Sequence, residues 1–405
     1  MFLPSARNWE EMRNEVAGCW PLPIDSGDEF AFVVKMQTSV IKAAYRKCPV
    51  SLTVAKANTE IGTVIATSLK FDDDPQSPLM LTGALRHNEE QVAIQSILRA
   101  GQTLMFFFDE LSRPIARASC TLIASSAQAA SDMLAVPGKR YSGAWSPLLS
   151  EVLDELQGIE DPQLASNPKH GVHVVKIGLT LSNFETIQLT TIGVDDVINF
   201  KLDDPDEGHG LEQSTWHLLE NLFSVNLFHS PVVKEGEVSR ELTDIFSLCS
   251  FGQCLFETKN SAILTTSLNR TTERRAKTVK KQIDKGIDQL VGAIKNLDAG
   301  LPLFTKKGQP LEIPLVSASS RHGIVMISEM LPSLDWEKIG SQLLAASKKT
   351  GAMLHVLDLR ELRVLVGISR DMPEMLLEYL TYRFKVMSER KHAMLRMRLE
   401  DQLPP

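Results

Sequence analysis

Two short apolar runs with a break between them are the feature that most constrains the second half of the chain. The first run covers residues 245–248 and the second covers residues 254–256, with Phe251-Gly252 between them. Apolar runs of this length on either side of a glycine-containing break are typical of a β-hairpin. We therefore expect two antiparallel strands here, joined by a turn centred on Phe251 and Gly252.

Charged side chains lie at the open end of this expected hairpin. With the turn at Phe251-Gly252, Asp244 falls opposite Lys259, and Glu257 lies two residues before Lys259 on the same strand. Side chains two residues apart share a face and diagonal neighbours can touch, so the three groups are expected to converge. Two carboxylates and an ammonium group there are costly unless a cation offsets the acids. Mg²⁺ takes such oxygen ligands, and the lysine would then orient or help deprotonate a water that attacks phosphorus.

The same residues resemble the signature of a known family. The sequence Glu-Leu-Thr-Asp is followed by twelve residues and then by Glu-Thr-Lys. This resembles the PD-(D/E)xK nuclease superfamily, in which an Asp begins one strand, an acidic-x-Lys triplet lies on the next, and helices flank the sheet. Asp244 matches the first acid, Glu257 the second and Lys259 the lysine, whereas Thr243 stands where the motif has proline. The resemblance covers residues 210–385 in layout, but only the hairpin and a following basic helix in motif.

The resemblance implies a fold, a cofactor and further ligands. The implied fold is a restriction-endonuclease-like α/β core, in which a mixed sheet is flanked by helices. The implied cofactor is Mg²⁺, with Mn²⁺ able to substitute. The helix that precedes the motif in this superfamily often carries another Glu, for which Glu220 is the candidate metal ligand and Glu212 the alternative. Glu241 is a candidate for an additional or indirect contact with the metal.

A helix rich in basic residues is expected to start near Thr271. Basic residues far outnumber acidic ones between 270 and 285, although the whole chain has a net charge of −7. A solvated face with ion pairs inside the helix is one explanation, but contact with phosphates explains the excess better in an acidic protein. The expected nucleic-acid contacts are Arg274, Arg275, Lys277, Lys280, Lys281 and Gln282. Superfamily members often have Gln or a basic residue facing the active site on this helix, which implies that role for Gln282 or Lys281.

The first half of the chain has the pattern of a β-rich module. Strand-like runs at residues 31–34, 50–54, 63–69 and 103–108 are separated by turn-forming segments. An apolar stripe at helical spacing, ended by a glycine, predicts a helix over residues 89–100. These residues by themselves indicate no function.

Three segments are expected along the chain, and the overall class is α+β or α/β. Residues 1–125 form the β-rich accessory or sensor module. Residues 126–207 either continue that β-rich structure or form a small second module, and they end in an acidic linker. Residues 208–405 hold the nuclease-like domain, in which strands are expected at 313–316 and 324–327, a helix at 336–348 and a strand pair around 354–366. The domain closes with an amphipathic stretch over 383–398. That stretch is expected to dock on the protein itself or on a partner subunit rather than on nucleic acid.

Composition narrows the location and the class of activity. No apolar run is long enough for a membrane-spanning helix, so no membrane partner is expected. The five cysteines are scattered and odd in number, which argues against a disulfide framework and indicates a reducing cytoplasm. No Walker phosphate loop or dinucleotide glycine motif is present, so a built-in ATPase or dehydrogenase is not expected.

The leading hypothesis is a Mg²⁺-dependent endonuclease that hydrolyses phosphodiester bonds of nucleic acid, DNA in preference to RNA. Its N-terminal half would regulate it, and the resemblance to prokaryotic defence nucleases implies a role against phage. One alternative is a catalytically silent nuclease-like module that binds nucleic acid or a partner protein. Another is a structural subunit, in which the C-terminal helix or the N-terminal module joins a homo-oligomer or a partner. Metal binding at the hairpin separates the first hypothesis from the other two.

Overall fold

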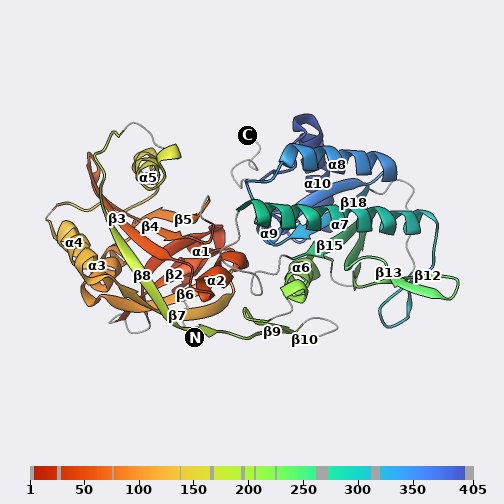
Figure 1. Ribbon diagram of the computed structural model, residues 1–405, viewed down its shortest axis with the longest axis horizontal. Helices are drawn as coiled ribbons and strands as arrows, with labels where there is room; N and C mark the ends of the chain where they lie inside the picture. Colours follow the sequence, from red (N-terminus) through yellow and green to blue (C-terminus); the bar gives the residue numbers. More distant parts are fainter. Residues whose placement is uncertain are drawn as a thin grey trace. The chain divides into compact units, whose positions relative to one another are not determined.

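The chain divides into two compact units, each with its own sheet (Figure 1). The N-terminal unit comprises residues 1–188 and 201–203, and the C-terminal unit comprises residues 189–200 and 204–405. Both combine helices with β-sheets, so the chain belongs to the mixed α+β class. The computed structural model describes residues 4–24, 29–74, 77–136, 138–164, 168–192, 197–204, 207–223, 226–260, 272–311 and 320–396.

An eight-stranded sheet forms most of the N-terminal unit. Its strand order is β1-β2-β6-β7-β8-β3-β4-β5, and all neighbouring pairs are antiparallel apart from β2 and β6. Strands β1 and β5 also contact each other, so the two edges of the sheet curl toward one another. The strands are β1 (Gly18–Ile24), β2 (Glu29–Lys35), β3 (Val50–Thr59), β4 (Gly62–Phe71), β5 (Leu79–Ala84), β6 (Gln102–Phe108), β7 (Pro114–Leu122) and β8 (His173–Thr186).

The N-terminal unit also contains helices. The helix predicted over residues 89–100 is confirmed as α3 (Asn88–Ala100), and it ends at Gly101, whose positive φ of 68° suits a glycine. The carboxylate of Glu90 in its first turn accepts a hydrogen bond from the backbone N–H of His87, 2.9 Å away. The other helices are α1 (Ala6–Asn14), α2 (Thr38–Tyr45), α4 (Ala124–Ala135), α5 (Pro147–Glu160) and the short 3₁₀ turn η1 (Pro162–Leu164).

The stretch 126–207 is divided between the two units. Strand β8 lies between β7 and β3 and pairs with both, and α4 and α5 belong to the same unit. The hairpin of β9 (Leu189–Ile192) and β10 (Val197–Phe200) groups instead with the C-terminal unit. Residues 126–188 thus group with the N-terminal unit and residues 189–200 with the C-terminal unit.

A five-stranded mixed sheet forms the centre of the C-terminal unit. Its order is β11-β14-β15-β18-β19, with β11, β14 and β15 antiparallel and β15, β18 and β19 parallel. The parallel pairs need crossover connections, which α7 and α8 supply. These strands are β11 (Leu227–His229), β14 (Ile245–Cys249), β15 (Gly252–Lys259), β18 (Ser320–Ile327) and β19 (Met353–Asp358).

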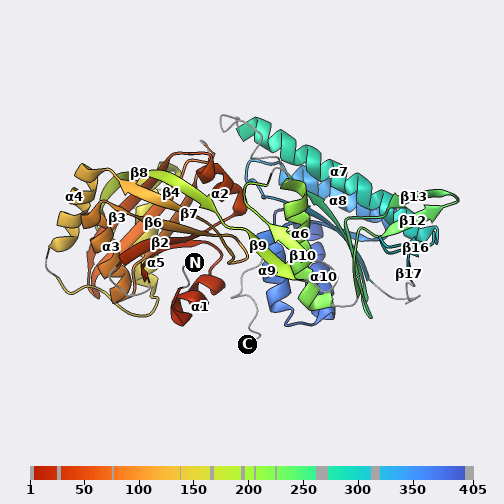
Figure 2. The same ribbon diagram turned by 90° about the horizontal axis from the view of Figure 1, so that it is seen from below.

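Helices cover both faces of this sheet (Figure 2). On one face, α7 (Thr272–Asp298) and α8 (Trp336–Thr350) pack against the row that includes Phe246 and Leu255. On the other face, α6 (Glu207–Phe223), α9 (Leu359–Ile368) and α10 (Pro373–Arg390) pack against the row that includes Ile245 and Phe256. Successive strand residues point to opposite faces, so neighbouring apolar residues of β14 and β15 serve two separate cores.

A smaller sheet lies beside the central one. Its order is β13-β12-β16-β17, in which β12 pairs with β13 and with β16 in antiparallel fashion. The strands are β12 (Val232–Glu235), β13 (Val238–Glu241), β16 (Leu303–Phe304) and β17 (Pro310–Leu311). The strand predicted at residues 313–316 lies outside the described residues.

Two expectations about the C-terminal part need correction. A strand pair was expected around 354–366, but β19 is followed by the helix α9. The Asp358 carboxylate accepts a hydrogen bond from the Glu361 backbone N–H, 2.9 Å away, and so caps the new helix. The amphipathic helix expected over 383–398 is α10, which begins earlier and ends before Lys391, whose φ is 53°. Its buried side packs on its own unit.

Within the described ranges, every helix is too short or too polar to span a membrane.

Candidate active site

The hairpin of β14 and β15 forms as predicted, but its turn lies one residue earlier than predicted. Cys249 pairs with Gly252, so Ser250 and Phe251 make the turn. Ile245 pairs with Phe256, and the same register brings Asp244 level with Glu257. The expectation that Asp244 lies opposite Lys259 is therefore wrong. Moving the turn by one residue shifts each pairing by two positions, so the side chains keep their faces.

Gly252 explains why the turn was misplaced. A glycine between two apolar runs is an ordinary sign of a turn, but Gly252 is the first residue of β15. A Cβ atom at this position would lie 2.0 Å from the carbonyl oxygen of Ser320 and 2.8 Å from a methyl group of Leu377. The glycine thus permits the close approach of β18 and α10, a long-range demand that is not visible in the local pattern.

Asp244, Glu257 and Lys259 come together on the face of the sheet that α7 and α8 cover. The Lys259 ammonium group lies 2.7 Å from Glu257 Oε2 and 3.7 Å from Asp244 Oδ2. Glu257 pairs with Val325 in the parallel ladder, which places both on the α7 side of β15 and β18. Two carboxylates from adjacent strands therefore share one lysine at the end of the hairpin.

Burial makes this arrangement electrostatically demanding. The side chains of Glu257, Lys259 and Asp244 are 2%, 9% and 20% exposed. Burial and the charge of Asp244 together raise the pKa of the Glu257 carboxyl to about 7, against the opposing effect of Lys259. One ammonium group does not offset two carboxylates, so a further cation would relieve the remaining repulsion.

The carboxylate of Asp244 is held by the neighbouring strand. Its Oδ2 accepts hydrogen bonds from the backbone N–H of Thr258 at 2.6 Å and from the Thr258 hydroxyl at 2.8 Å. Across the hairpin, the Thr243 hydroxyl donates to the carbonyl oxygen of Phe256 at 2.7 Å. Asp244 therefore has a fixed orientation, with Oδ1 as the oxygen that these bonds leave to other ligands.

The other predicted acids lie elsewhere. Glu220 is on α6, which packs on the opposite face of the sheet. Glu212 pairs with His229 at 2.5 Å, and Glu241 is exposed on β13. Among the described residues, no group of three or more Asp, Glu, His or Cys side chains is placed to hold a metal. The structure thus brings two carboxylates together, and a ligand role for Glu220 stays a prediction. Two carboxylates suit Mg²⁺, which usually keeps several waters.

Helix α7 lies directly over the strands that carry the site. A Cβ atom on Gly286 would lie 2.7 Å from Val325, the ladder partner of Glu257, and Leu290 lies over Gly323. Later helix residues therefore lie over earlier strand residues. The first turns of α7 must extend over the carboxyl end of β15, where Lys259 lies.

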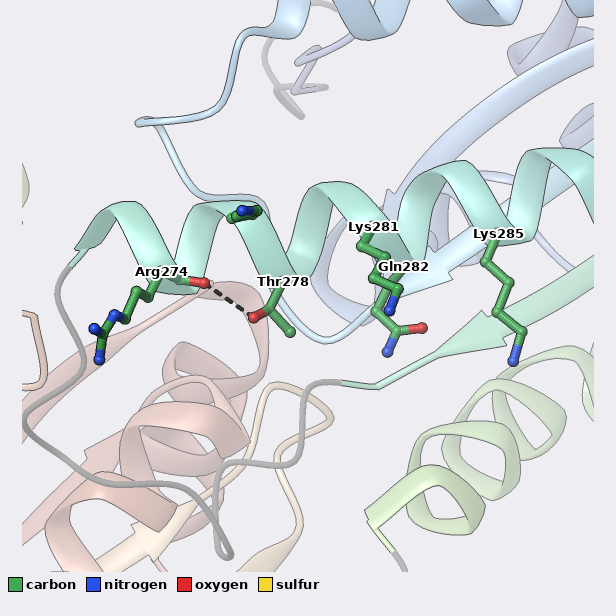
Figure 3. Close-up of a pocket in the computed structure, with 6 residues that line it drawn as sticks. Arg274, Thr278, Lys281, Gln282 and Lys285 are labelled. Carbon is green, nitrogen blue, oxygen red and sulfur yellow. Dashed lines mark hydrogen bonds between the residues drawn. The ribbon is translucent and has the colours of Figure 1, made fainter.

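The exposed side of α7 bears a row of cations. Their spacing of three or four residues places them on one face, and they border a hollow of about 600 Å³. Figure 3 shows labelled side chains of this set along the same side of the helix. The residues that line the hollow are Arg274, Lys277, Thr278, Lys281, Gln282 and Lys285.

The six predicted nucleic-acid contacts divide into two groups. Arg274, Lys277, Lys281 and Gln282 line the hollow. Arg275 instead pairs with the buried Glu329, at 2.9 Å from Nε. Lys280 pairs with Asp284 at 2.5 Å and donates to Gln342 of α8 at 2.9 Å.

Two of the predicted contacts, Arg275 and Lys280, thus pair with other side chains of the protein. The hollow in turn includes a lysine that was not predicted. Lys277, Lys281 and Lys285 form no ion pair with any residue that the structure describes. Lys285 belongs to the hollow although it was not among the predicted contacts. Its position four residues after Lys281 was the signal that would have included it.

No family model, curated protein or solved structure matches this chain. A function must therefore be argued from the site itself.

Proposed function

We propose that the C-terminal unit is a metal-dependent nuclease core of the PD-(D/E)xK type, with Asp244 and Glu257 as metal ligands. The observation that carries the proposal is the meeting of these acids with Lys259 at the open end of the β14–β15 hairpin. An Asp just before one strand and a Glu-x-Lys triplet on the next, in a mixed sheet between two layers of helices, fit the layout of that superfamily.

The residues present fit a divalent cation. Asp244 and Glu257 would hold it through their carboxylates, and the burial of Glu257 together with the partial burial of Asp244 favours neutralisation of their charge. When bound, Mg²⁺ or Mn²⁺ would act as a Lewis acid on the scissile phosphate and lower the pKa of a coordinated water. Lys259, held by Glu257, orients the attacking water and offsets the negative charge that builds on the phosphate.

The hollow of α7 is the proposed binding surface for the rest of the substrate. From Arg274 to Lys285 the helix advances by about 16 Å, at ~1.5 Å per residue. Successive phosphates of one duplex strand are about 3.4 Å apart along the axis, so the row is long enough for several of them. This length favours a polynucleotide over a single nucleotide as the substrate. Lysine and arginine contacts with phosphates carry no sequence information, so cleavage is expected to depend little on sequence.

DNA is the proposed substrate in preference to RNA. Regulation by the N-terminal unit and a role against phage are part of the same proposal. They rest on the resemblance to defence nucleases alone, which is an argument from architecture and not from a site.

The experiment that tests the proposal is cleavage of supercoiled plasmid, linear duplex, single-stranded DNA and RNA in the presence of Mg²⁺ or Mn²⁺. Asp244→Ala is expected to remove metal binding and cleavage together. Lys259→Ala is expected to keep metal binding and to lower the cleavage rate by about a hundredfold or more, because it removes a charge that acts on the developing phosphate. Glu237→Ala, at an exposed turn between β12 and β13, is the matched control and is expected to behave as wild type.

A second candidate function has one observation in its favour. Only two carboxylates meet at the site within the described residues, and Lys259 already neutralises one of them. A nuclease-like module that binds nucleic acid without cutting it would fit this arrangement. Nucleic-acid binding that needs neither metal nor Asp244, together with no cleavage under any of the conditions above, would favour this candidate over the nuclease.

A further inference from the structure

Two threonines flank the candidate metal ligands in a reciprocal arrangement. Thr243 precedes Asp244, and its hydroxyl bonds to the carbonyl of Phe256, the residue before Glu257. Thr258 follows Glu257, and its hydroxyl and N–H both bond to the carboxylate of Asp244. Each threonine is thus the chain neighbour of one acid and is bonded to the strand or side chain that carries the other.

These bonds begin where the backbone ladder stops. The last pair of the β14–β15 ladder is Ile245 with Phe256, so Asp244 and Thr243 lie beyond it. Bonds that involve side chains therefore link the two strands at the open end of the hairpin. The Thr243 side chain is almost completely buried, which strengthens the demand that its hydroxyl be paired.

We propose that Thr243 and Thr258 are positioning residues that hold the two carboxylates of the candidate site at the spacing a divalent cation requires. This inference rests on the proposed function. Thr258 bonds twice to Oδ2 of Asp244, and these bonds leave Oδ1 for a metal ion. Thr243 fixes the peptide that carries Glu257, a task that the proline of the superfamily motif cannot perform because it has no donor. Bonds that orient metal-binding carboxylates usually contribute strongly to metal affinity.

The test compares Thr258→Val and Thr243→Val with Thr258→Ser and Thr243→Ser in the full chain. Valine keeps the shape of the side chain and removes the hydroxyl, whereas serine restores it. Mn²⁺ affinity is measured by calorimetry, and kcat and KM are measured on the nucleic acid that the wild type cleaves. Thr258→Val is expected to weaken Mn²⁺ binding and to lower kcat, each by about tenfold or more, with KM unchanged. Thr243→Val is also expected to weaken Mn²⁺ binding and to lower kcat. The serine variants are expected to return both quantities to near wild-type values.

Thr381→Val is the matched control. Its hydroxyl bonds to the carbonyl of Leu377 at 2.8 Å within α10, so the variant loses a similar bond away from the site. Thermal unfolding of every variant separates misplacement of the ligands from general loss of stability. If the wild type binds Mn²⁺ and the valine variants bind it equally well, the positioning role is overturned while the proposed function stands. If Thr381→Val weakens Mn²⁺ binding as much as Thr258→Val, the positioning role is overturned as well. A wild type that binds no Mn²⁺ overturns both.

Discussion

At the scale of single residues, the candidate site is defined by a conflict between burial and charge. Glu257 is nearly inaccessible, faces a second carboxylate, and has one lysine as its cationic partner. A buried arrangement of this kind contributes little net stability because the desolvation of each charged group opposes the attraction between them. Its presence is better explained by function than by stability.

Glu90 is a buried acid away from the site, and its effect on the free energy of unfolding can be measured. It is 3% exposed in the first turn of α3, and burial raises the pKa of its carboxyl to about 7. The unfolded chain loses this proton near pH 4.5, before the folded chain does. The free energy of unfolding therefore falls as the pH rises from about 4.5 to about 7, and the loss is complete above that range. A neutral residue at this position avoids the loss.

We expect Glu90→Gln to be more stable than wild type at pH 8, with a smaller difference at pH 5. The amide oxygen of glutamine can still accept the hydrogen bond from the N–H of His87, so the start of α3 is kept. Urea unfolding at both pH values measures the effect. Glu10→Gln, at an exposed position of α1, is the control and should change stability little at either pH. Equal stabilities of Glu90→Gln and wild type at pH 8 would contradict the expectation.

At the scale of elements, the sequence predicted what depends on local pattern. The hairpin, α3 and α7 follow from apolar periodicity, with Gly101 marking the end of α3, and all three are present. The register of the hairpin was not predicted because a glycine is needed at 252 by the close approach of Ser320, which lies far along the chain. The sequence predicts a strand where α9 lies because the cap residue of α9, Asp358, is also the last residue of β19. Apolar residues spaced by two in the strand therefore run directly into apolar residues spaced by three or four in the helix.

The candidate site was also predictable in part, because its three residues lie in one local element. Asp244, Glu257 and Lys259 share one hairpin, so their meeting depends on strand parity, which survives an error in the turn. Arg275 and Lys280 were read as nucleic-acid contacts because their charge is visible in the sequence. The partner of Arg275, Glu329, comes from a distant segment, so that pairing could not be foreseen. Lys280 also bonds to the distant Gln342, but its ion-pair partner Asp284 lies four residues along the same helix and was visible in the sequence.

The row of cations on α7 leads to a prediction for binding without cleavage. We expect Lys281→Ala combined with Lys285→Ala to weaken binding of a short duplex severalfold at moderate salt. The salt dependence of log K should become shallower by about one unit for each phosphate-contacting lysine removed. Fluorescence anisotropy in EDTA measures both quantities while metal-dependent cleavage is blocked.

The control for this prediction uses the same residue type on the same helix. Lys295 is exposed on α7 but lies outside the hollow, so Lys295→Ala should leave the affinity and its salt slope nearly unchanged. An equal loss in the control and in the double variant would show that the contact is a diffuse attraction to any lysine and not to the row of cations.

At the scale of the whole molecule, each unit has its own buried core. Apolar clusters around Phe108 and Leu156 belong to the N-terminal unit, and those around Phe246 and Phe256 belong to the C-terminal unit. Separate cores allow each unit to unfold in its own transition. A ligand that binds one folded unit raises the transition of that unit first.

Calorimetric unfolding in the presence of Mn²⁺ therefore tests the location of the metal site independently of cleavage. At about 100 times its dissociation constant, a ligand adds about 2.7 kcal/mol to the stability of the unit that binds it. For a unit of this size that corresponds to a rise of roughly 5–10 °C in its midpoint. We expect one transition to rise and the other to stay in place, and the rise to vanish in Asp244→Ala. A rise that persists in Asp244→Ala would place the metal elsewhere in the chain. A single transition that rises as a whole would mean that the two units unfold together. Binding at the hairpin would then be felt across the chain, and control by the N-terminal unit would have a direct thermodynamic route.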